Sequence, residues 1–337
     1  MPRSDRAAAR PAEVCAPRFE YRRADPLDSS AEDALLQIHF GVGARVGAPA
    51  QDAPGVVHLA LEPLSGADLC EVWPAHGPVV RGREDAVRYS ADGEHLAGVV
   101  ELDERDWGGI AGAAQRAYQL IGHFHAASGY PYVLRIWNYF DGINQGVGDA
   151  ERYKQFCIGR AAGLAWPPGN GHPAASAIGR RDGDPRLQVY WLAGRRAGVA
   201  LENPRQIAAY RYPRQYGPQA PRFSRAMLTS GPTLMVSGTA SIVGHASCHR
   251  DDLRAQLRET FENLASLHQL ALRTSVGLGA DLGAGTLLKI YLRDGRALPQ
   301  LDALLAQHLP AGCRTLVLAA DICRTELLIE IDCVQGP

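Results

Sequence analysis

Residues 251–267, DDLRAQLRETFENLASL, predict one amphipathic helix. Apolar side chains recur at spacings of four, four, three and three residues, so they share one helix face. These side chains are Leu253, Leu257, Phe261, Leu264 and Leu267. Asp251 and Asp252 come directly before the first of them, where acidic groups stabilise a helix N-terminus. Such an apolar face has to pack against another element of the fold.

The segments around this helix predict an alternation of strands and helices. Apolar runs predict strands over 233–240, 287–293, 313–320 and 326–334, and a second helix fits 296–308. The C-terminal part therefore has the order β–α–β–α–β–β.

The N-terminal part has a similar order. Helices are expected over 108–127 and 148–164, and strands over 133–140 and 187–193. Short strands are expected before them, over 56–62 and 97–102, with turn-rich sequence between. The similarity of the two orders predicts an α+β protein made of two related mixed-sheet halves, with helices packed on one face.

The expected domain limits follow from these elements. Residues 1–34 are rich in proline, arginine and alanine and predict a flexible tail. Residues 35–195 form the predicted N-terminal α+β domain, and residues 196–337 the C-terminal one. A long loop rich in arginine, tyrosine and proline is expected over 196–232.

Composition narrows the possible functions. The 337 residues include 35 basic and 36 acidic ones, so charge gives no reason to expect nucleic acid or an anionic membrane as a partner. No apolar run approaches the length of a membrane span, and the N-terminus lacks the apolar core of a signal peptide. Seven cysteines without CxxC pairs predict reduced thiols, and hence a cytoplasmic protein.

Several common site motifs are missing from the sequence. It contains no GxGxxG, GxxxxGK[ST], HExxH or GxSxG pattern. His245, Cys248 and His249 lie within five residues, but no second cluster at zinc spacing accompanies them. We favour a structural role for these side chains near the following helix, and we expect no metal.

Two segments concentrate groups that recognise carboxylates. Residues 210–218, YRYPRQYGP, alternate tyrosines and arginines in a loop stiffened by prolines. In the helix over 148–164, Tyr153 and Arg160 lie two turns apart on an otherwise apolar face, where an arginine needs an anion. These segments fit either a surface with stacked rings or a site for an anionic small molecule.

The last strand carries two carboxylates on one face. Alternation places Leu328, Glu330 and Asp332 together. A carboxyl group in so apolar a strand would have a raised pKa, which suits a general acid. The residue pattern fits a solvent-facing edge equally well.

The C-terminal third resembles the YjgF/RidA superfamily. The resemblance rests on Ser237-Gly238, the helix with Gln256 and Glu262-Asn263-Leu264, the strand from Lys289, Arg314 opening a strand, and the final Glu330-Ile-Asp pattern. Their order implies that both halves have a YjgF/RidA-like fold.

The whole chain from about residue 35 resembles a narrower family, the chorismatases. The matching segments are WNYFDGIN (137–144), ERYKQFCIGR (151–160), ENPRQ (202–206), YRYPRQYGP (210–218), SGTASIVGH (237–245) and DICRTELLIEID (321–332). This resemblance implies an enzyme that cleaves chorismate without a metal or organic cofactor.

The resemblance also implies roles for individual residues. Glu330 falls on the family's catalytic glutamate, which protonates the enolpyruvyl methylene carbon so that pyruvate can depart. Substrate-binding positions fall on Tyr153, Arg160, Tyr212 and Arg214, with Gly238 in the turn beside them. Chorismate is a diacid, so two arginines in one pocket make physical sense.

Subtypes of the family differ in the ring product. Some members release a dihydroxycyclohexadiene carboxylate, others make 3-hydroxybenzoate, and a third type, linked to pigment and quinone precursors, makes both 3- and 4-hydroxybenzoate. Aromatising members carry a cysteine seven residues before the glutamate and a glycine in the turn. Cys323 and Gly238 meet both conditions. The resemblance therefore implies 3-hydroxybenzoate, together with 4-hydroxybenzoate.

Two alternatives stay open at this point. A RidA-like imine or enamine deaminase would use Arg314 to hold a carboxylate, and a non-catalytic protein would bind an aromatic acid without turnover. The sequence leaves open the product ratio, the possibility of a homo-oligomer, and whether Lys154 or Arg314 contacts substrate.

Overall fold

Helix α3 (Leu253–Thr274) forms over the stretch predicted to be helical and packs its apolar face on a sheet. The carboxylate of Asp252 accepts a hydrogen bond from the Ala255 N–H at 3.0 Å and caps the helix. The computed structural model describes residues 15–23, 33–41, 53–66, 68–164, 171–275, 277–310 and 312–336.

The sheet beneath α3 has seven strands. In spatial order they are β12 (Val199–Leu201), β13 (Ala226–Leu228), β14 (Leu234–Thr239), β19 (Ile329–Gln335), β17 (Thr286–Leu292), β18 (Arg314–Ala319) and β4 (Pro63–Ser65). Helix α4 (Leu298–His308) packs beside α3 on the same face. A small hairpin, β15 (Ile242–Val243) and β16 (Ala246–Ser247), lies between β14 and α3 in the sequence.

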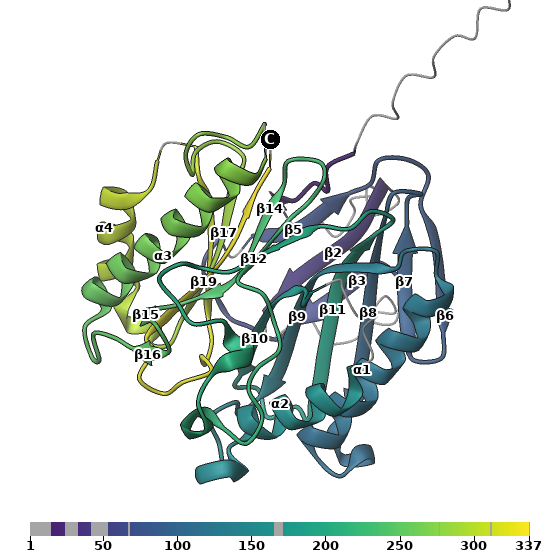
Figure 1. Ribbon diagram of the computed structural model, residues 1–337, viewed down its shortest axis with the longest axis horizontal. Coiled ribbons are helices and arrows are strands. Elements are labelled where there is room, and N and C mark those ends of the chain that lie inside the picture. Colours follow the sequence, from purple (N-terminus) through teal and green to yellow (C-terminus); the bar gives the residue numbers. More distant parts are fainter. Residues whose placement is uncertain are drawn as a thin grey trace, which may run out of the picture.

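The second large sheet has six strands. Their spatial order is β10 (Ala174–Arg180), β9 (Tyr132–Asp141), β11 (Arg186–Gly194), β8 (His95–Asp103), β7 (Val87–Ala91) and β6 (Val80–Glu84). Helices α1 (Ile110–Ala127) and α2 (Arg152–Gly163) cover one face of it. Figure 1 shows α1 and α2 on one side of the molecule and α3 and α4 on another.

The two large sheets have the same connectivity. In each, a strand leads through a helix to a second strand, and a second helix leads to a third strand that pairs parallel to the second. The final strand, β11 or β19, then inserts antiparallel between the first two. This duplication confirms the prediction of an α+β fold with two related mixed-sheet halves and helices on one face of each.

A close approach of backbone and ring marks the centre of the six-stranded sheet. Gly98 of β8 pairs in register with Trp191 of β11. A Cβ atom on Gly98 would overlap the indole, which is fully buried. Glycine at this point makes room for the largest side chain of the helix-facing core.

The faces of the sheets away from the helices share one core. It contains Trp137 and Tyr190 from the six-stranded sheet and Tyr291 and Leu316 from the seven-stranded sheet. A third sheet, with the order β1 (Glu20–Arg23), β5 (Leu69–Pro74), β2 (Ala34–Phe40) and β3 (Val56–Leu59), contributes Leu36 and Trp73 to it.

Several expectations need correction. Strand β1 lies inside the segment expected to be a flexible tail, because its backbone pairs with β5; residues 1–14 and 24–32 lie outside the described part. Strands β5, β6, β7 and β10 were not predicted, and the expected loop over 196–232 contains β12 and β13. Strand β4 pairs with β18 of the other half, so backbone pairing crosses the predicted domain limit at residue 195.

No helix in the described part of the chain is both long and apolar enough to cross a membrane.

Candidate active site between the two halves

A cavity lies where the edge strand β10 of one half meets β14 of the other. The peptide N–H of Ala175 donates to the Ser237 hydroxyl at 2.8 Å, and the Gly238 N–H donates to Ser176 Oγ at 2.8 Å. The cavity has a volume of about 200 Å³. It is lined by helix α2, strands β10 and β14, and the segments 206–225 and 323–330. Both halves therefore contribute side chains to one site.

Glu330 lines this cavity. It pairs opposite Tyr291 in the β19–β17 ladder, and its side chain is 4% exposed. Burial raises the pKa of its carboxyl group to about 8, and the charge of Asp332 adds to the increase. The nearby guanidinium of Arg135 opposes it. Glu330 is therefore largely a neutral acid at pH 7, as a general acid must be.

Gly238 packs directly against that acid. A Cβ atom at this position would overlap Oε1 of Glu330 and approach Ser176 Oγ at 3.1 Å. The absence of a side chain at residue 238 thus gives the Glu330 carboxyl group the space that it occupies.

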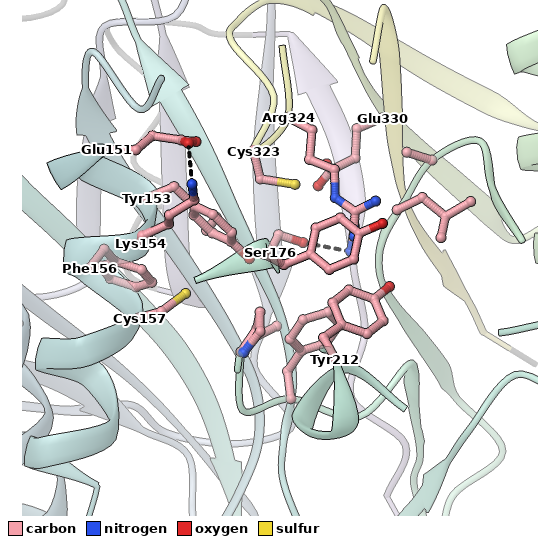
Figure 2. Close-up of a pocket in the computed structure, with 18 of the residues that line it drawn as sticks. Glu151, Tyr153, Lys154, Phe156, Cys157, Ser176, Tyr212, Cys323, Arg324 and Glu330 are labelled. Carbon is pink, nitrogen blue, oxygen red and sulfur yellow. Dashed lines mark hydrogen bonds and ion pairs between the residues drawn. The ribbon is translucent and has the colours of Figure 1, made fainter. Parts of the chain in front are cut away.

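Cys323 lines the same side of the cavity as Glu330 (Figure 2). Burial raises the pKa of its thiol far above the ordinary value, and the neighbouring Glu330 raises it further. The sulfur is therefore a neutral thiol and a poor nucleophile at physiological pH. Across the cavity, α2 presents Tyr153, Phe156 and Cys157.

Three arginines line the cavity, and none of them forms an ion pair with a described carboxylate. Arg160 is 4% exposed, and its Nε and Nη2 atoms have no hydrogen-bond partner among the described residues. Its guanidinium lies 5.0 Å from the ring centre of Tyr118. A buried cation without an anion is costly, so this face of the cavity is built to receive a negative group.

Arg225 and Arg324 supply the other two cations. Arg225 donates to the hydroxyl of Tyr212 at 2.6 Å, and its Nε atom is buried without a partner. Arg324 donates to the His245 carbonyl at 2.9 Å and lies 4.0 Å from the ring centre of Tyr216. Tyrosine rings, backbone atoms and the Ser247 hydroxyl hold these guanidinium groups in place. Glu202 near Arg225 and Glu326 near Arg324 act on them without forming an ion pair.

The structure brings most of the predicted residues together. Glu330, Cys323, Tyr153, Arg160, Tyr212 and Gly238 all line the cavity. The exception is Arg214, which lies outside it with a 64% exposed side chain. Its guanidinium forms a bidentate ion pair with Asp149 on the surface, at 3.0 and 2.5 Å. The position of Arg214 therefore does not support the predicted substrate contact.

Two further basic residues have partners of their own. Lys154 donates to the Gly148 carbonyl at 2.9 Å and pairs with Glu151 at 3.2 Å, so its charge is matched within α2 and the turn before it. Arg314 opens β18 and donates to the carbonyl of Tyr21. Arg314 is not among the residues that line the cavity.

The histidines before α3 have structural contacts, as favoured from the sequence. His249 lies 3.1 Å from a Glu259 carboxylate oxygen, and His245 bonds to the Tyr216 hydroxyl at 3.1 Å. The second contact fixes one wall of the cavity.

Sequence reasoning missed three residues of the site. Ser176 lies on β10, which was not predicted as a strand. Arg225 lies in the segment expected to be a loop, and Arg324 follows Cys323 within the quoted segment 321–332. Arg324 could have been found from that adjacency, whereas no local signal distinguishes Arg225 from the exposed arginines around it.

Comparison with known proteins gives consistent matches. Residues 71–193 match the family model described as "Chorismatase FkbO/Hyg5-like, N-terminal". A chorismatase from Streptomyces rapamycinicus is 34% identical over 95% of this chain and 98% of its own length. A 3-hydroxybenzoate synthase from Streptomyces hygroscopicus is 34% identical over 78% of this chain and 80% of its own. A chorismatase crystal structure matches 96% of this chain and 99% of its own, with 29% identity and a TM-score of 0.83.

Proposed function

The chain belongs to the chorismatase family, and from this premise we propose that it cleaves chorismate to pyruvate and 3-hydroxybenzoate, with Glu330 as the proton donor. The same proposal includes 4-hydroxybenzoate as a second ring product. A cytoplasmic location is part of it, in keeping with seven cysteines that are all free thiols.

One observation carries the proposal: a neutral buried acid shares a cavity with three arginines that form no ion pair with a described carboxylate. Chorismate has two carboxylates, one on the ring and one on the enolpyruvyl group. Arg160 on α2 and the pair Arg225 and Arg324 on the opposite half can each receive one. That arrangement orients the substrate between the two halves and directs the enolpyruvyl group toward Glu330.

The chemistry requires one proton to be delivered to carbon. Glu330 gives its proton to the terminal methylene of the enolpyruvyl ether, and the positive charge develops on the adjacent ether carbon as an oxocarbenium ion. The new Glu330 carboxylate lies in a desolvated site, where its attraction to that cation is strong. The ring C–O bond of the ether then breaks, and its electron pair completes the carbonyl group of the departing pyruvate. The neighbouring hydroxyl oxygen moves to the vacated ring carbon in 3-hydroxybenzoate and stays on its own carbon in 4-hydroxybenzoate.

The balance of atoms separates the two product types. Pyruvate and hydroxybenzoate together contain every atom of chorismate, so aromatisation consumes no water. The ring loses a proton as it becomes aromatic, and that proton can restore the Glu330 acid. Formation of the dihydroxy diene instead consumes one water. Gly238 and the neutral thiol of Cys323 beside Glu330 support the aromatising type by resemblance.

The test is to incubate the purified protein with chorismate and to resolve pyruvate and ring products by chromatography and mass. We expect pyruvate with hydroxybenzoates, and we expect Glu330→Gln to abolish turnover while an unreactive dicarboxylate analogue still binds. Pyruvate with a dihydroxy diene would refute the aromatising type. Undiminished turnover in Glu330→Gln would refute the role of this residue.

The two alternatives receive less support. The deaminase alternative needs Arg314 at the substrate, whereas this residue contacts the carbonyl of Tyr21. An exposed Glu330, or one paired with an arginine outside the cavity, would support the alternative of a non-catalytic binding protein. Glu330 is instead buried and lines the cavity. The possibility of a homo-oligomer stays a prediction.

A further inference from the structure

Asp332 lies two residues beyond Glu330 on the same face of β19 and is 3% exposed. Four donors surround its carboxylate. Oδ1 accepts from Arg135 Nη2 at 2.9 Å and from Ser176 Oγ; Oδ2 accepts from Trp137 Nε1 at 2.9 Å and from the Tyr291 hydroxyl at 3.1 Å. This set fills the acceptor sites of an ionised carboxylate.

Three of these four donors have a proton that can point only toward Asp332; the Tyr291 hydroxyl also contacts Tyr139. Guanidinium and indole groups have no acceptor. Ser176 Oγ already accepts from the Gly238 N–H at 2.8 Å and from Arg135 at 2.5 Å, so its own proton is left for Asp332. Toward Arg135, Trp137 and Ser176 the Asp332 carboxyl group can act only as a hydrogen-bond acceptor, which is the role of a carboxylate.

A buried chain of hydrogen bonds extends from Asp332 to a second ion pair. The Tyr291 hydroxyl bonds to Tyr139 at 2.7 Å, and Tyr139 bonds to Tyr190 at 3.1 Å. Lys289 donates to Tyr190 at 3.2 Å and pairs with Glu71 at 2.5 Å. The chain joins both large sheets and the third sheet, which fixes Asp332 in the core that they share.

Glu330 has the opposite environment. Its carboxyl group faces the cavity and has no hydrogen bond to any residue in the described ranges, although it lies on the same strand face. Four charged groups act on it: Asp332 favours the neutral acid, whereas Arg135, Arg225 and Arg293 favour the carboxylate. Two neighbouring carboxyl groups with such different partners divide the roles of fixed anion and proton donor.

We propose that Asp332 is a positioning residue, whose fixed negative charge keeps Glu330 in its acid form and favours cationic charge in the cavity. This rests on the proposed function of Glu330. After Glu330 gives up its proton, two anions lie side by side, and their repulsion favours return of a proton from the aromatising ring. Asp332 thus favours the protonated form of Glu330 before proton transfer and its reprotonation afterwards, without contacting the substrate.

The deciding experiment replaces Asp332 by asparagine, which keeps the shape and removes the charge. The titration of Glu330 is followed by ¹³C-carboxyl NMR of glutamate-labelled protein, with Glu330→Gln used to assign the signal. We expect the Glu330 midpoint in Asp332→Asn to fall by about 1–2 pH units. The alkaline limb of kcat should move by a similar amount. A midpoint within about 0.3 unit of the wild-type value overturns the proposal.

Glu71→Gln is the matched control, because it makes the same carboxylate-to-amide change in the same buried chain. We expect it to lower thermal stability but to leave the titration midpoint of Glu330 unchanged. If Glu71→Gln shifts that midpoint as much as Asp332→Asn does, a general loosening of the core, and not the charge of Asp332, causes the shift. If Asp332→Asn does not fold, Trp137→Phe removes one of the four donors. Because the fixed negative charge then has less compensation, we expect the midpoint to move upward by a smaller amount, and a downward shift or none contradicts the proposal.

The NMR measurement separates this proposal from the proposed function. It reads the ionisation of Glu330 whether or not chorismate is cleaved. A shifted midpoint without turnover would retain the electrostatic role of Asp332 and reject the proposed reaction.

Discussion

Gly238 and Glu330 lie in such close contact on neighbouring strands that a single methyl group on residue 238 would occupy the position of the Glu330 carboxyl oxygen. The proposed general acid and the irregular end of β14 around Gly238 are therefore one structural unit. A side chain at residue 238 would alter the position of the proton that is to be transferred.

The first prediction concerns this contact. We expect Gly238→Ala to displace the Glu330 carboxyl group, to lower the rate of hydroxybenzoate formation at least about tenfold, and to raise the fraction of dihydroxy diene. Product chromatography checks both effects. Gly77→Ala is the control, because the nearest atom to a Cβ there is 3.6 Å away. Unchanged rate and products in Gly238→Ala would show that the contact does not control the acid.

The second prediction separates two arginines that the sequence treats alike. Arg160→Gln should raise KM for chorismate at least about tenfold, because a substrate carboxylate then lacks its buried cation. The same change removes an unmatched buried charge, so the melting temperature should stay constant or rise. Arg214→Gln should leave kcat/KM within about twofold, since it breaks only a surface pair with Asp149. A large increase of KM in Arg214→Gln would instead mean that the substrate contacts Arg214 outside the cavity.

The third prediction uses the raised pKa of Glu330, about 8 against an ordinary value of 4.5. Between these two values the unfolded chain releases the proton and the folded chain keeps it, so the free energy of unfolding falls as the pH rises through this window. Glu330→Gln lacks this loss. Its stability relative to wild type should grow by roughly 1–3 kcal/mol between pH 5 and pH 8. Denaturant titrations at both pH values measure the difference, and a constant difference would mean an ordinary pKa.

The fourth prediction concerns the thiol beside the acid. Burial raises the pKa of Cys323, so the residue serves as a neutral group and not as a nucleophile. We expect Cys323→Ala to keep pyruvate release within about tenfold and to change the distribution of ring products. Cys248→Ala, outside the cavity, should change neither. Complete loss of pyruvate release in Cys323→Ala would point to covalent catalysis.

Local pattern predicted the elements with one clear period. The helix from Leu253 and the strand that carries Glu330 and Asp332 formed where expected, because side-chain alternation and helical spacing are properties of short segments. Strand β10 was not predicted, because its sequence AASAIGR is buried on both faces of the sheet and lacks the alternation of apolar and polar residues that indicates a strand.

Local sequence pattern could not predict which arginine of this region lines the cavity. Arg214 and Arg225 belong to the same proline-rich region, and either could point inward. Asp149, from a turn before α2, holds Arg214 at the surface, while Tyr212 holds Arg225 at the cavity. These partners come from tertiary packing, which spacing along the sequence does not contain.

The two halves of the duplicated fold differ in the side chain that lies against an equivalent glycine. In each half a glycine on the first strand leaves space beside the last strand, but the two halves fill that space differently: Trp191 faces Gly98, whereas Glu330 faces Gly238. Of these two openings in the described part of the chain, only the one beside Gly238 therefore contains a candidate proton donor. One opening holds an indole and serves the stability of the core, and its counterpart holds an acid next to empty space.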